Sequence, residues 1–235
     1  MIPVVLQVEG LRYERAAAPR SDDSFAIGVD RLVLRAGEAL GLVGPSGCGK
    51  STLIDLLALL RQPSRIDRFE LQGSDVAALW RARDVNACTG LRARHIGVVL
   101  QTGGLIPSLS VRENVLVPQR LLGRVDIVWV DLLLESLDLD RLGNRLPAQL
   151  SIGQRQRVAI ARAVSHRPAL VLADEPTASL GIDHAPAAMD LLLGLARDSG
   201  AALIVASHDV GLLQARNVPL RHCAARSGDV GVAST

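Results

Sequence analysis

The sequence predicts an α/β fold, and three observations carry this prediction. A glycine-rich loop between Gly44 and Thr52 connects a short apolar run to an apolar helical run. Two further apolar runs, 169–174 and 202–206, end in polar residues, as interior strands of a parallel sheet do. Residues 105–150, in contrast, show helical patterns and no convincing strand. We therefore expect a core of parallel strands and helices with a helical segment inserted into it.

Length and composition fit one large domain. The chain has 235 residues, of which 49% are hydrophobic, enough to bury a core of its own. The formal net charge is +2 without a long basic run, so nothing indicates a nucleic-acid partner. The cysteines Cys48, Cys88 and Cys223 lack the spacing of a disulfide scaffold or zinc site, which suits a reducing cytosol. For Cys48 two interpretations stay open: a reactive thiol at a helix start, or a small residue where space is short.

Residues 1–9 lack the basic start and the cleavage site of a signal peptide. No apolar run approaches the ~18 residues that a membrane-spanning helix needs. We therefore expect a cytoplasmic protein that reaches a membrane only through a partner.

The loop before the first helix matches the phosphate-binding pattern G-x-x-x-x-G-K-[ST] at every fixed position. Its glycines let successive backbone N–H groups point at phosphate oxygens, and the following helix adds the positive end of its dipole. A glycine-rich turn without a role, or a dinucleotide fold, explains the following Lys-Ser less well. We expect nucleotide contacts from the whole loop: Gly44, Pro45, Ser46, Gly47, Cys48, Gly49, Lys50, Ser51 and Thr52.

Two residues of this loop supply distinct chemistry. Lys50 is the only lysine among 26 basic residues, and its compact ammonium follows a moving phosphate better than a planar guanidinium does. The hydroxyl of Ser51 is placed to coordinate Mg²⁺. A nucleoside triphosphate with Mg²⁺ is therefore the expected ligand.

Polar residues after the predicted strands complete the candidate site. Asp174 can hold Mg²⁺ through its water shell, and Glu175 can polarise an attacking water, whereas the alternative is a solvated acidic turn. His208 can sense a terminal phosphate, or be an ordinary histidine at a strand edge. A buried strand is expected from His95 to Gln101. Two interpretations of Gln101 are equally good: a residue at the rim of a site, or a loop residue.

Strands are also expected over 4–13, 25–34, 38–43 and 66–72, with a loop over 15–24 and a weak final strand or loose tail over 218–235. Tyr13 stands just before the loop. Its ring could stack on a purine base or pack at a strand end.

Helix signals dominate the middle of the chain. Ser110 and Glu113 form a capping box that opens a helix reaching about Leu121. Trp129 is expected in the core or at a subdomain contact. The next helix, over 125–137, carries an apolar stripe of Ile127, Val130, Leu134 and Leu137.

A further helix begins after Leu150. Ser151 can cap it and Gly153 leaves its amides uncovered, so this start also suits an anion. From periodicity alone, three arginines on this helix are expected to form a solvated face: Arg155, Arg157 and Arg162.

The order of these motifs resembles the ATP-binding cassette family over roughly residues 4–215. Leu150-Ser-Ile-Gly-Gln154 is similar to the family's signature, with Ile152 where glycine is usual. The resemblance implies a P-loop NTPase core of the RecA-like type, residues 1–101 and 165–235, with an antiparallel β portion. Residues 102–164 would form the helical subdomain.

The resemblance also implies that two chains sandwich two ATP molecules head to tail. Lys50 of one chain would face Ser151, Gly153 and Gln154 of the other across each ATP. Gln101 would join Ser51 and Asp174 at Mg²⁺, and would act with Glu175 and His208 in catalysis. Tyr13 would stack on adenine, with Phe25 as the alternative.

Residues 98–115 look most like the subgroup that powers lipoprotein release, macrolide export and cell-division complexes. Its members attach to a separately encoded membrane protein, whose cytoplasmic helix would dock beside Gln101. Gly181 stands where the family usually has aspartate, and Asp183 follows two residues on, so tight coupling between the two ATP sites is not expected.

Two functions stay open at this point: an ATPase that drives export or lipid handling, and an ATP-gated interaction module of the cell-division type. A soluble DNA-repair or translation ATPase fits less well, because one cassette is present and no long coiled coil separates Lys50 from Ser151.

Overall fold

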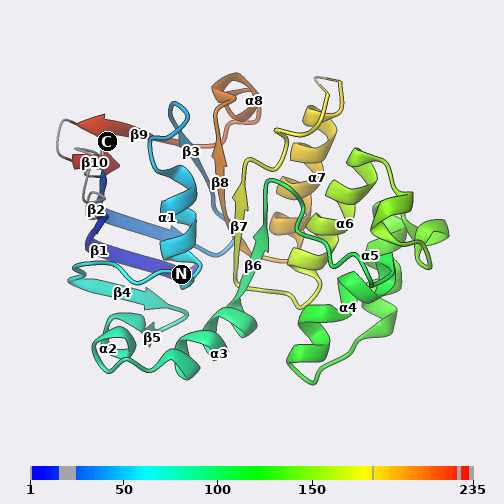
Figure 1. Cartoon of the computed structure of the whole chain (residues 1–235), viewed down its shortest axis with the longest axis horizontal. Helices are drawn as coiled ribbons and strands as arrows, with labels where there is room; N and C mark the ends of the chain where they lie inside the picture. The colour runs from blue at the N-terminus through cyan, green and yellow to red at the C-terminus, as the bar shows by residue number, and fades with distance from the viewer. Residues whose placement is uncertain (1, 16–24, 182, 227–228, 233–235) are drawn as a thin grey trace, which may run out of the picture.

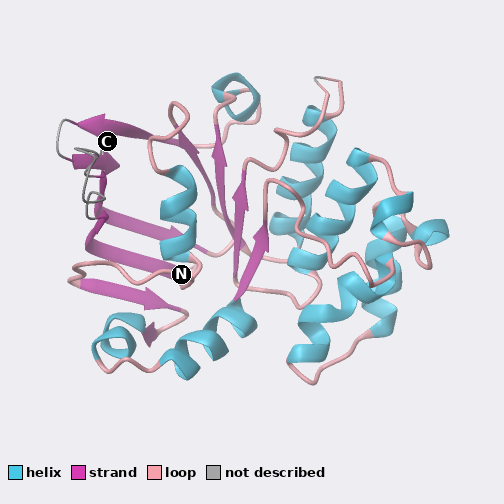
Figure 2. Cartoon of the chain, viewed as in Figure 1, coloured by secondary structure: helices cyan, strands magenta, loops and turns pink. Residues whose placement is uncertain are grey.

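The computed structural model describes residues 2–15, 25–181, 183–226 and 229–232. Within these residues the strands form one sheet in the order β5-β4-β1-β2-β10-β9-β3-β8-β7-β6. Figure 2 shows the strands at the left and centre and, at the right, a group of helices without strands. The strands are β1 Val4–Arg15, β2 Phe25–Arg35, β3 Ala39–Val43, β4 Arg68–Leu71, β5 Ser74–Asp75, β6 Ile96–Val99, β7 Leu170–Asp174, β8 Ala202–Ser207, β9 Leu220–Arg226 and β10 Asp229–Val232.

The antiparallel β portion expected from the amino-terminal strands is present. β1 pairs antiparallel with both β2 and β4, and β4 pairs antiparallel with β5. Leu6, Val8 and Leu11 of β1 are fully buried, whereas Gln7 and Glu9 between them are partly exposed, as one-sided burial requires. Of the loop expected over 15–24, residues 16–24 lie outside the described residues.

The parallel core sheet consists of β6, β7, β8 and β3, with β9 parallel to β3 at its other side. Alternate residues of β7 enter two different core clusters: Leu170 and Leu172 on one face, Val171 and Ala173 on the other. Because both faces of this strand are buried, its sequence is a continuous apolar run.

Helices cover both faces of the core sheet and extend beyond β6 (Figure 1). The region 102–164, expected to be a helical subdomain, contains α4, α5 and α6 and no strand, although α6 also packs on β6 and α7. The helices are α1 Lys50–Leu57, α2 Val76–Arg81, α3 Val85–His95, α4 Val111–Leu121, α5 Ile127–Ser136, α6 Ile152–Val164, α7 Ala185–Asp198 and α8 Val210–Gln214, with 3₁₀ turns η1 Asp140–Leu142 and η2 Pro147–Gln149.

The predicted helix starts are confirmed, with one correction in α5. Capping boxes are present at Ser110 for α4 and at Ser151 for α6. In α5, Asp126 caps the helix, so Ile127 becomes its first residue and is 46% exposed, outside the buried stripe that was predicted. The other stripe residues, Val130, Leu134 and Leu137, are buried.

Two strand predictions are corrected at their ends. His95 closes α3 and β6 ends at Val99, so Gln101 lies in the turn that follows rather than in the strand. The carboxyl-terminal segment forms two strands instead of one weak strand or a tail. β9 lies between β3 and β10, and β10 lies parallel to β2, so the pair joins the two halves of the sheet. Backbone pairing on both sides supports β9, whose small and polar sequence gives little strand signal.

In the part of the chain that the structure describes, no helix is both long enough and apolar enough to cross a membrane.

Candidate functional site

The candidate site is built around the loop 44–49, which joins β3 to α1. Gly49 occupies the N-cap of α1 at φ 99°, a conformation that favours glycine. Gly44 is needed for space, because a Cβ on it would lie 2.4 Å from the carbonyl oxygen of Cys223. β3 therefore leads directly into a tight turn. Because of this turn, the first backbone N–H groups of α1 point toward one place.

Lys50 is held inside this loop. Its side chain is only 6% exposed, and Nζ donates to the carbonyl oxygens of Gly44 at 2.8 Å and Pro45 at 3.2 Å. Nζ also lies 3.7 Å from Oε1 of Glu175. A buried ammonium with these three partners forms a fixed positive centre at the mouth of the loop.

Asp174, the last residue of β7, is suited to hold a cation. Burial raises the pKa of its carboxyl group, and a hydrogen bond from Ser51 opposes that shift. Its Oδ1 is buried and has no hydrogen-bond partner among the residues that the structure describes. An unsatisfied carboxylate oxygen beside a hydroxyl matches the all-oxygen ligand set that Mg²⁺ prefers. The residues present therefore fit the predicted cation.

Glu175 connects this edge of the sheet to the loop. Its backbone lies in the left-handed region at φ 48°, and its N–H donates to the carbonyl of Ala206 at 2.9 Å. The carboxylate is 13% exposed, and Oε2 lies 2.8 Å from Nδ1 of His208. Strained backbone of this kind persists where the surroundings hold it, often at functional sites.

A hollow of about 630 Å³ opens at this point. Its lining brings together residues that the sequence separates by more than 150 positions. They include Ser46, Lys50, Ser51, Gln101, Glu175 and His208. Gln101 thus lies in the turn after β6 and also lines this hollow, so its place in a loop and its place at the rim are compatible, and its role stays a prediction.

The start of α6 lines a different hollow, of about 650 Å³, together with Leu180, Gly181 and His184. Ser151 caps α6 by accepting the N–H of Gln154, whose side chain accepts the N–H of Ser151 in return. The two hollows share no lining residue. Within one chain, the structure therefore does not bring Ser151 and Gly153 to Lys50.

Comparison with known proteins identifies the family. The sequence pattern described as ABC transporter matches residues 30–178. The chain belongs to the ABC transporter family. It is 38% identical over 210 residues to a lipoprotein-releasing system ATP-binding protein, LolD, of Paramagnetospirillum magneticum, covering 88% of this chain and 90% of that protein. It is 42% identical over 192 residues to the ABC transporter ATP-binding protein YbbA of Escherichia coli K12, covering 80% and 82%.

Solved structures that resemble this chain are also ATP-binding cassettes or parts of ABC transporters. The dimeric, post-hydrolysis ATP-binding cassette MJ0796 bound to ADP and Pi superposes with a TM-score of 0.79 at 28% identity, covering 96% of each chain. CbiO1 of Clostridium perfringens, part of the transporter complex cbiONQ, gives 0.76 at 25% identity, covering 97% of this chain and 86% of that one. The chain is therefore an ABC-type ATPase that binds and hydrolyses ATP.

The residue expected to stack on adenine, Tyr13, lies apart from the other predicted site residues. Tyr13 does not line the 630 Å³ hollow. Its hydroxyl accepts a hydrogen bond from Arg61 at 2.9 Å, and the Arg61 guanidinium lies 5.4 Å from the ring centroid. Phe25 begins β2 opposite Arg15, and its side chain lies outside the described residues. The role of Tyr13 remains a prediction, and sequence patterns gave no sign of Arg61.

The three arginines of α6 do not form the solvated face that periodicity predicts. Each guanidinium donates to backbone carbonyls: Arg155 to Leu150, Arg157 to Leu137, and Arg162 to Gly103 and Gly104. Burial lowers the pKa of Arg162. These side chains tie the signature helix of the cassette to neighbouring loops. Trp129 is a subdomain contact as expected, because its Nε1 donates to the carbonyl of Ser165.

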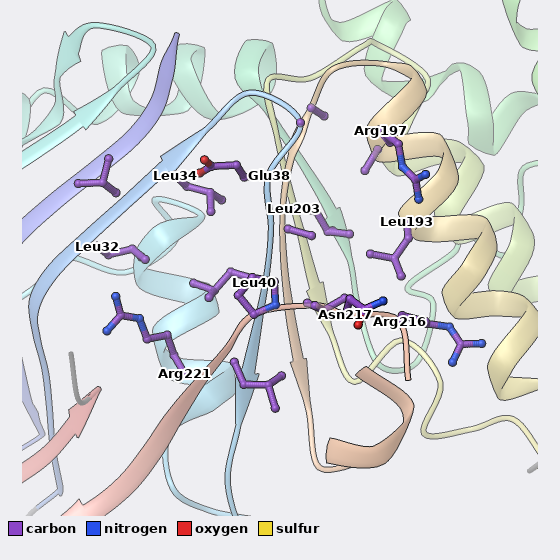
Figure 3. A pocket seen from close by; sticks show the side chains of 18 residues that line it. Leu32, Leu34, Glu38, Leu40, Leu193, Arg197, Leu203, Arg216, Asn217 and Arg221 are labelled. Atoms are coloured by element: carbon purple, nitrogen blue, oxygen red, sulfur yellow. The ribbon is translucent and has the colours of Figure 1, made fainter. Parts of the chain in front are cut away.

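A further hollow of about 580 Å³ lies beside α7 at the opposite end of β3, where Glu38 precedes the strand (Figure 3). Leu34, Leu40 and Leu203 point into it and Arg197 stands at its edge. No predicted site residue lines it, so the ATP-related chemistry of the cassette is confined to the other end of the sheet.

Proposed function

We propose that two copies of this ATPase close around two ATP molecules and that the dimer drives a separately encoded membrane protein from its cytoplasmic side. The separation of the two hollows carries the proposal. Ser151 and Gly153 contact an ATP at Lys50 only if they come from another chain. The dimeric state of MJ0796, which matches 96% of this chain, supports the same arrangement.

In this arrangement the residues at the loop take distinct roles. ATP gives Lys50 phosphate oxygens in place of the carbonyls of Gly44 and Pro45. Glu175 orients the attacking water and accepts its proton, while His208 contacts the terminal phosphate. The first amides of α1 and those of the partner's signature helix surround the charge that develops on the phosphate.

Mg²⁺ would be held by Ser51, Gln101 and, through water, Asp174, and when bound it would neutralise charge on the phosphates. The buried, unsatisfied Oδ1 of Asp174 supports this assignment.

The membrane protein would dock where the core meets the helices beyond β6. A hollow of about 220 Å³ lies between α3, β6, α4 and α6. Leu121, which lines this hollow, is 75% exposed, and Leu100 and Ile106, in the segment that follows β6, are 40% and 38% exposed. A partner helix with an apolar face fits this groove.

The complex would release lipoproteins or export a lipid-like substrate. The relation to a LolD protein over 88% of the chain supports this choice. Gly181, in place of the usual aspartate, favours a second candidate, an ATP-gated interaction module that moves no substrate. Lipoprotein release from vesicles containing the purified complex supports the first candidate and excludes the second.

Glu175→Gln tests the hydrolytic role. The variant keeps the shape of the side chain and its contact with His208, so we expect ATP binding and ATP-induced dimers to persist while steady-state phosphate release vanishes. Unchanged turnover in this variant would contradict the mechanism.

Leu121→Asp tests the docking groove. We expect it to abolish co-purification with the separately encoded membrane protein while leaving ATP binding intact. Leu132→Asp is the matched control, since Leu132 is 55% exposed on α5 and does not line the groove. Equal loss in both variants would contradict the assignment of this surface.

A further inference from the structure

Two of the three cysteines meet beneath the phosphate loop. Cys48 belongs to the loop and Cys223 to β9, and each is 3% exposed. The parallel pairing of Val43 with His222 carries Cys223 level with the first loop residue, Gly44. The two thiols lie in the same core cluster, and the Cys48 thiol is a hydrogen-bond partner of Cys223.

The phosphate loop is closely packed at this contact. A Cβ on Gly44 would lie 2.4 Å from the carbonyl oxygen of Cys223 and 2.9 Å from Sγ of Cys48. The backbone of Gly44 is therefore packed against the Cys223 carbonyl and against the Cys48 thiol. Any change in the distance between their sulfurs must move the loop or β9.

The two thiols are equally buried but differ in their surroundings. Burial raises the pKa of Cys223 to about 12, with the nearby Cys48 adding to the shift, so Cys223 is held as a neutral thiol. Cys48 is not itself in the lining of the 630 Å³ hollow, but it stands between Gly47 and Gly49, which are. Of the two cysteines, only Cys48 belongs to the segment that lines the hollow, so we expect a small oxidant in the hollow to meet Cys48 before Cys223.

We propose that Cys48 and Cys223 form an oxidation site, at which a peroxide converts the pair to an intrachain disulfide that closes the phosphate loop to ATP. The proposal rests on the ATP-binding role of the loop. Its chemistry needs a peroxide as the oxidant, with hydrogen peroxide as the simplest case. In a reducing cytosol such a bond is transient and senses redox state.

The reaction proceeds in two balanced steps. The Cys48 sulfur attacks one oxygen of hydrogen peroxide, the O–O bond breaks, and Cys48 becomes a sulfenic acid, while the leaving hydroxide takes up the proton of the Cys48 thiol and departs as water. Cys223 then attacks the Cys48 sulfur, the S–O bond breaks, and a second water leaves with the Cys223 proton. Two thiols are oxidised to one disulfide, and one peroxide is reduced to two waters.

The disulfide would move the phosphate loop out of the conformation that binds phosphate. An S–S bond of about 2 Å is far shorter than the contact between two unbonded sulfurs. Forming it draws the loop toward β9, and the backbone amides around Lys50 leave the positions at which they meet phosphate. Losing one or two such charge-assisted hydrogen bonds weakens ATP binding about tenfold or more.

The test uses the full chain treated with hydrogen peroxide in the absence and presence of MgATP. We expect non-reducing peptide mapping to recover a peptide linking Cys48 to Cys223, ATP affinity to fall about tenfold, and dithiothreitol to restore it. MgATP should slow the reaction, because it covers the hollow through which the oxidant enters.

Two variants sharpen the test. Cys223→Ser, or Cys223→Val if serine impairs folding, should bind ATP equally before and after peroxide. Cys88→Ser should respond like the unmodified chain, because Cys88 lies on α3. Absence of the linked peptide overturns the proposal, and so does a linked peptide with unchanged ATP affinity. Failure of the reduced chain to bind ATP would count instead against the role of the loop.

Discussion

Glu175 and His208 lie 2.8 Å apart, Oε2 to Nδ1, at the carboxyl ends of the neighbouring parallel strands β7 and β8. The backbone N–H of His208 donates to the same Oε2 at 3.4 Å. On its other side, Oε1 of Glu175 lies 3.7 Å from Nζ of Lys50. One carboxylate thus connects the positive centre of the loop to an imidazole whose Nε2 remains available for a phosphate oxygen.

His208→Ala should separate catalysis from binding. Since His208 contacts Glu175 and is proposed to contact the terminal phosphate, we expect steady-state turnover to fall about 100-fold, while ATP affinity, expected to depend mainly on the loop, changes little. Phosphate release and equilibrium ATP binding measure the two effects. His222→Ala is the control, because His222 is also an exposed histidine but lies on β9. This variant should keep normal turnover. Equal turnover in both variants would rule out the role given to His208.

Asp174→Asn should stabilise the nucleotide-free protein at neutral pH. The folded chain raises the pKa of this carboxyl group, mainly through burial, so folding costs free energy once the group is ionised. That cost is absent at a pH below the ordinary aspartate pKa and grows as the pH rises toward the raised value. We expect Asn to remove it, for a gain of about 1 kcal/mol.

Thermal unfolding at several pH values measures this gain. The advantage of Asp174→Asn should be present at pH 7.5 and shrink as the pH falls through the carboxylate range, while Mg²⁺-dependent turnover is lost throughout. A variant less stable than the original chain at neutral pH would contradict the argument. It would mean that the Ser51 hydrogen bond stabilises the ionised carboxylate by more free energy than its burial costs.

Ser151→Ala and Ser110→Ala form a matched pair. Each removes the capping side chain of a helix that begins with a capping box, so each should destabilise the fold by about 1 kcal/mol. Only Ser151 stands in the signature motif, so only Ser151→Ala should weaken ATP-induced dimers. Denaturant unfolding and sedimentation with ATP in the Glu175→Gln background measure the two effects. Equal dimerisation by both variants would remove Ser151 from the interface.

The parts of the site that the sequence predicts well are local. The phosphate loop, the capping box at Ser151 and the acidic end of β7 each consist of adjacent residues whose chemistry and spacing can be recognised without a fold. Gln101 and His208 each follow a buried strand, and the carboxyl ends of parallel strands meet at one edge of the sheet. That geometry favours a place near the loop, whereas the residues alone left a second interpretation open for each: a loop residue for Gln101 and an ordinary strand-edge histidine for His208.

The parts that could not be predicted depend on long-range packing. Periodicity places Arg157 on a polar helix face, but only the fold brings the carbonyl of Leu137 to it. The pairing of β9 with β3 places Cys223 next to the loop. The small and polar residues of this segment carry no sequence pattern that predicts the pairing. The same holds for Arg61, which reaches Tyr13 across 48 positions.

Tyr13→Ala decides whether this ring stacks on adenine. The Arg61 guanidinium lies 5.4 Å from the centroid of the ring, and stacking of a base on an aromatic ring contributes about 1–3 kcal/mol. We expect the variant to bind ATP at least tenfold more weakly, yet to bind inorganic tripolyphosphate unchanged, because only ATP carries a base. Isothermal titration of both ligands against Tyr13→Ala and Phe25→Ala makes the comparison. A loss confined to Phe25→Ala would transfer the role to Phe25, and equal losses for ATP and tripolyphosphate in Tyr13→Ala would show a structural effect on the loop instead of stacking.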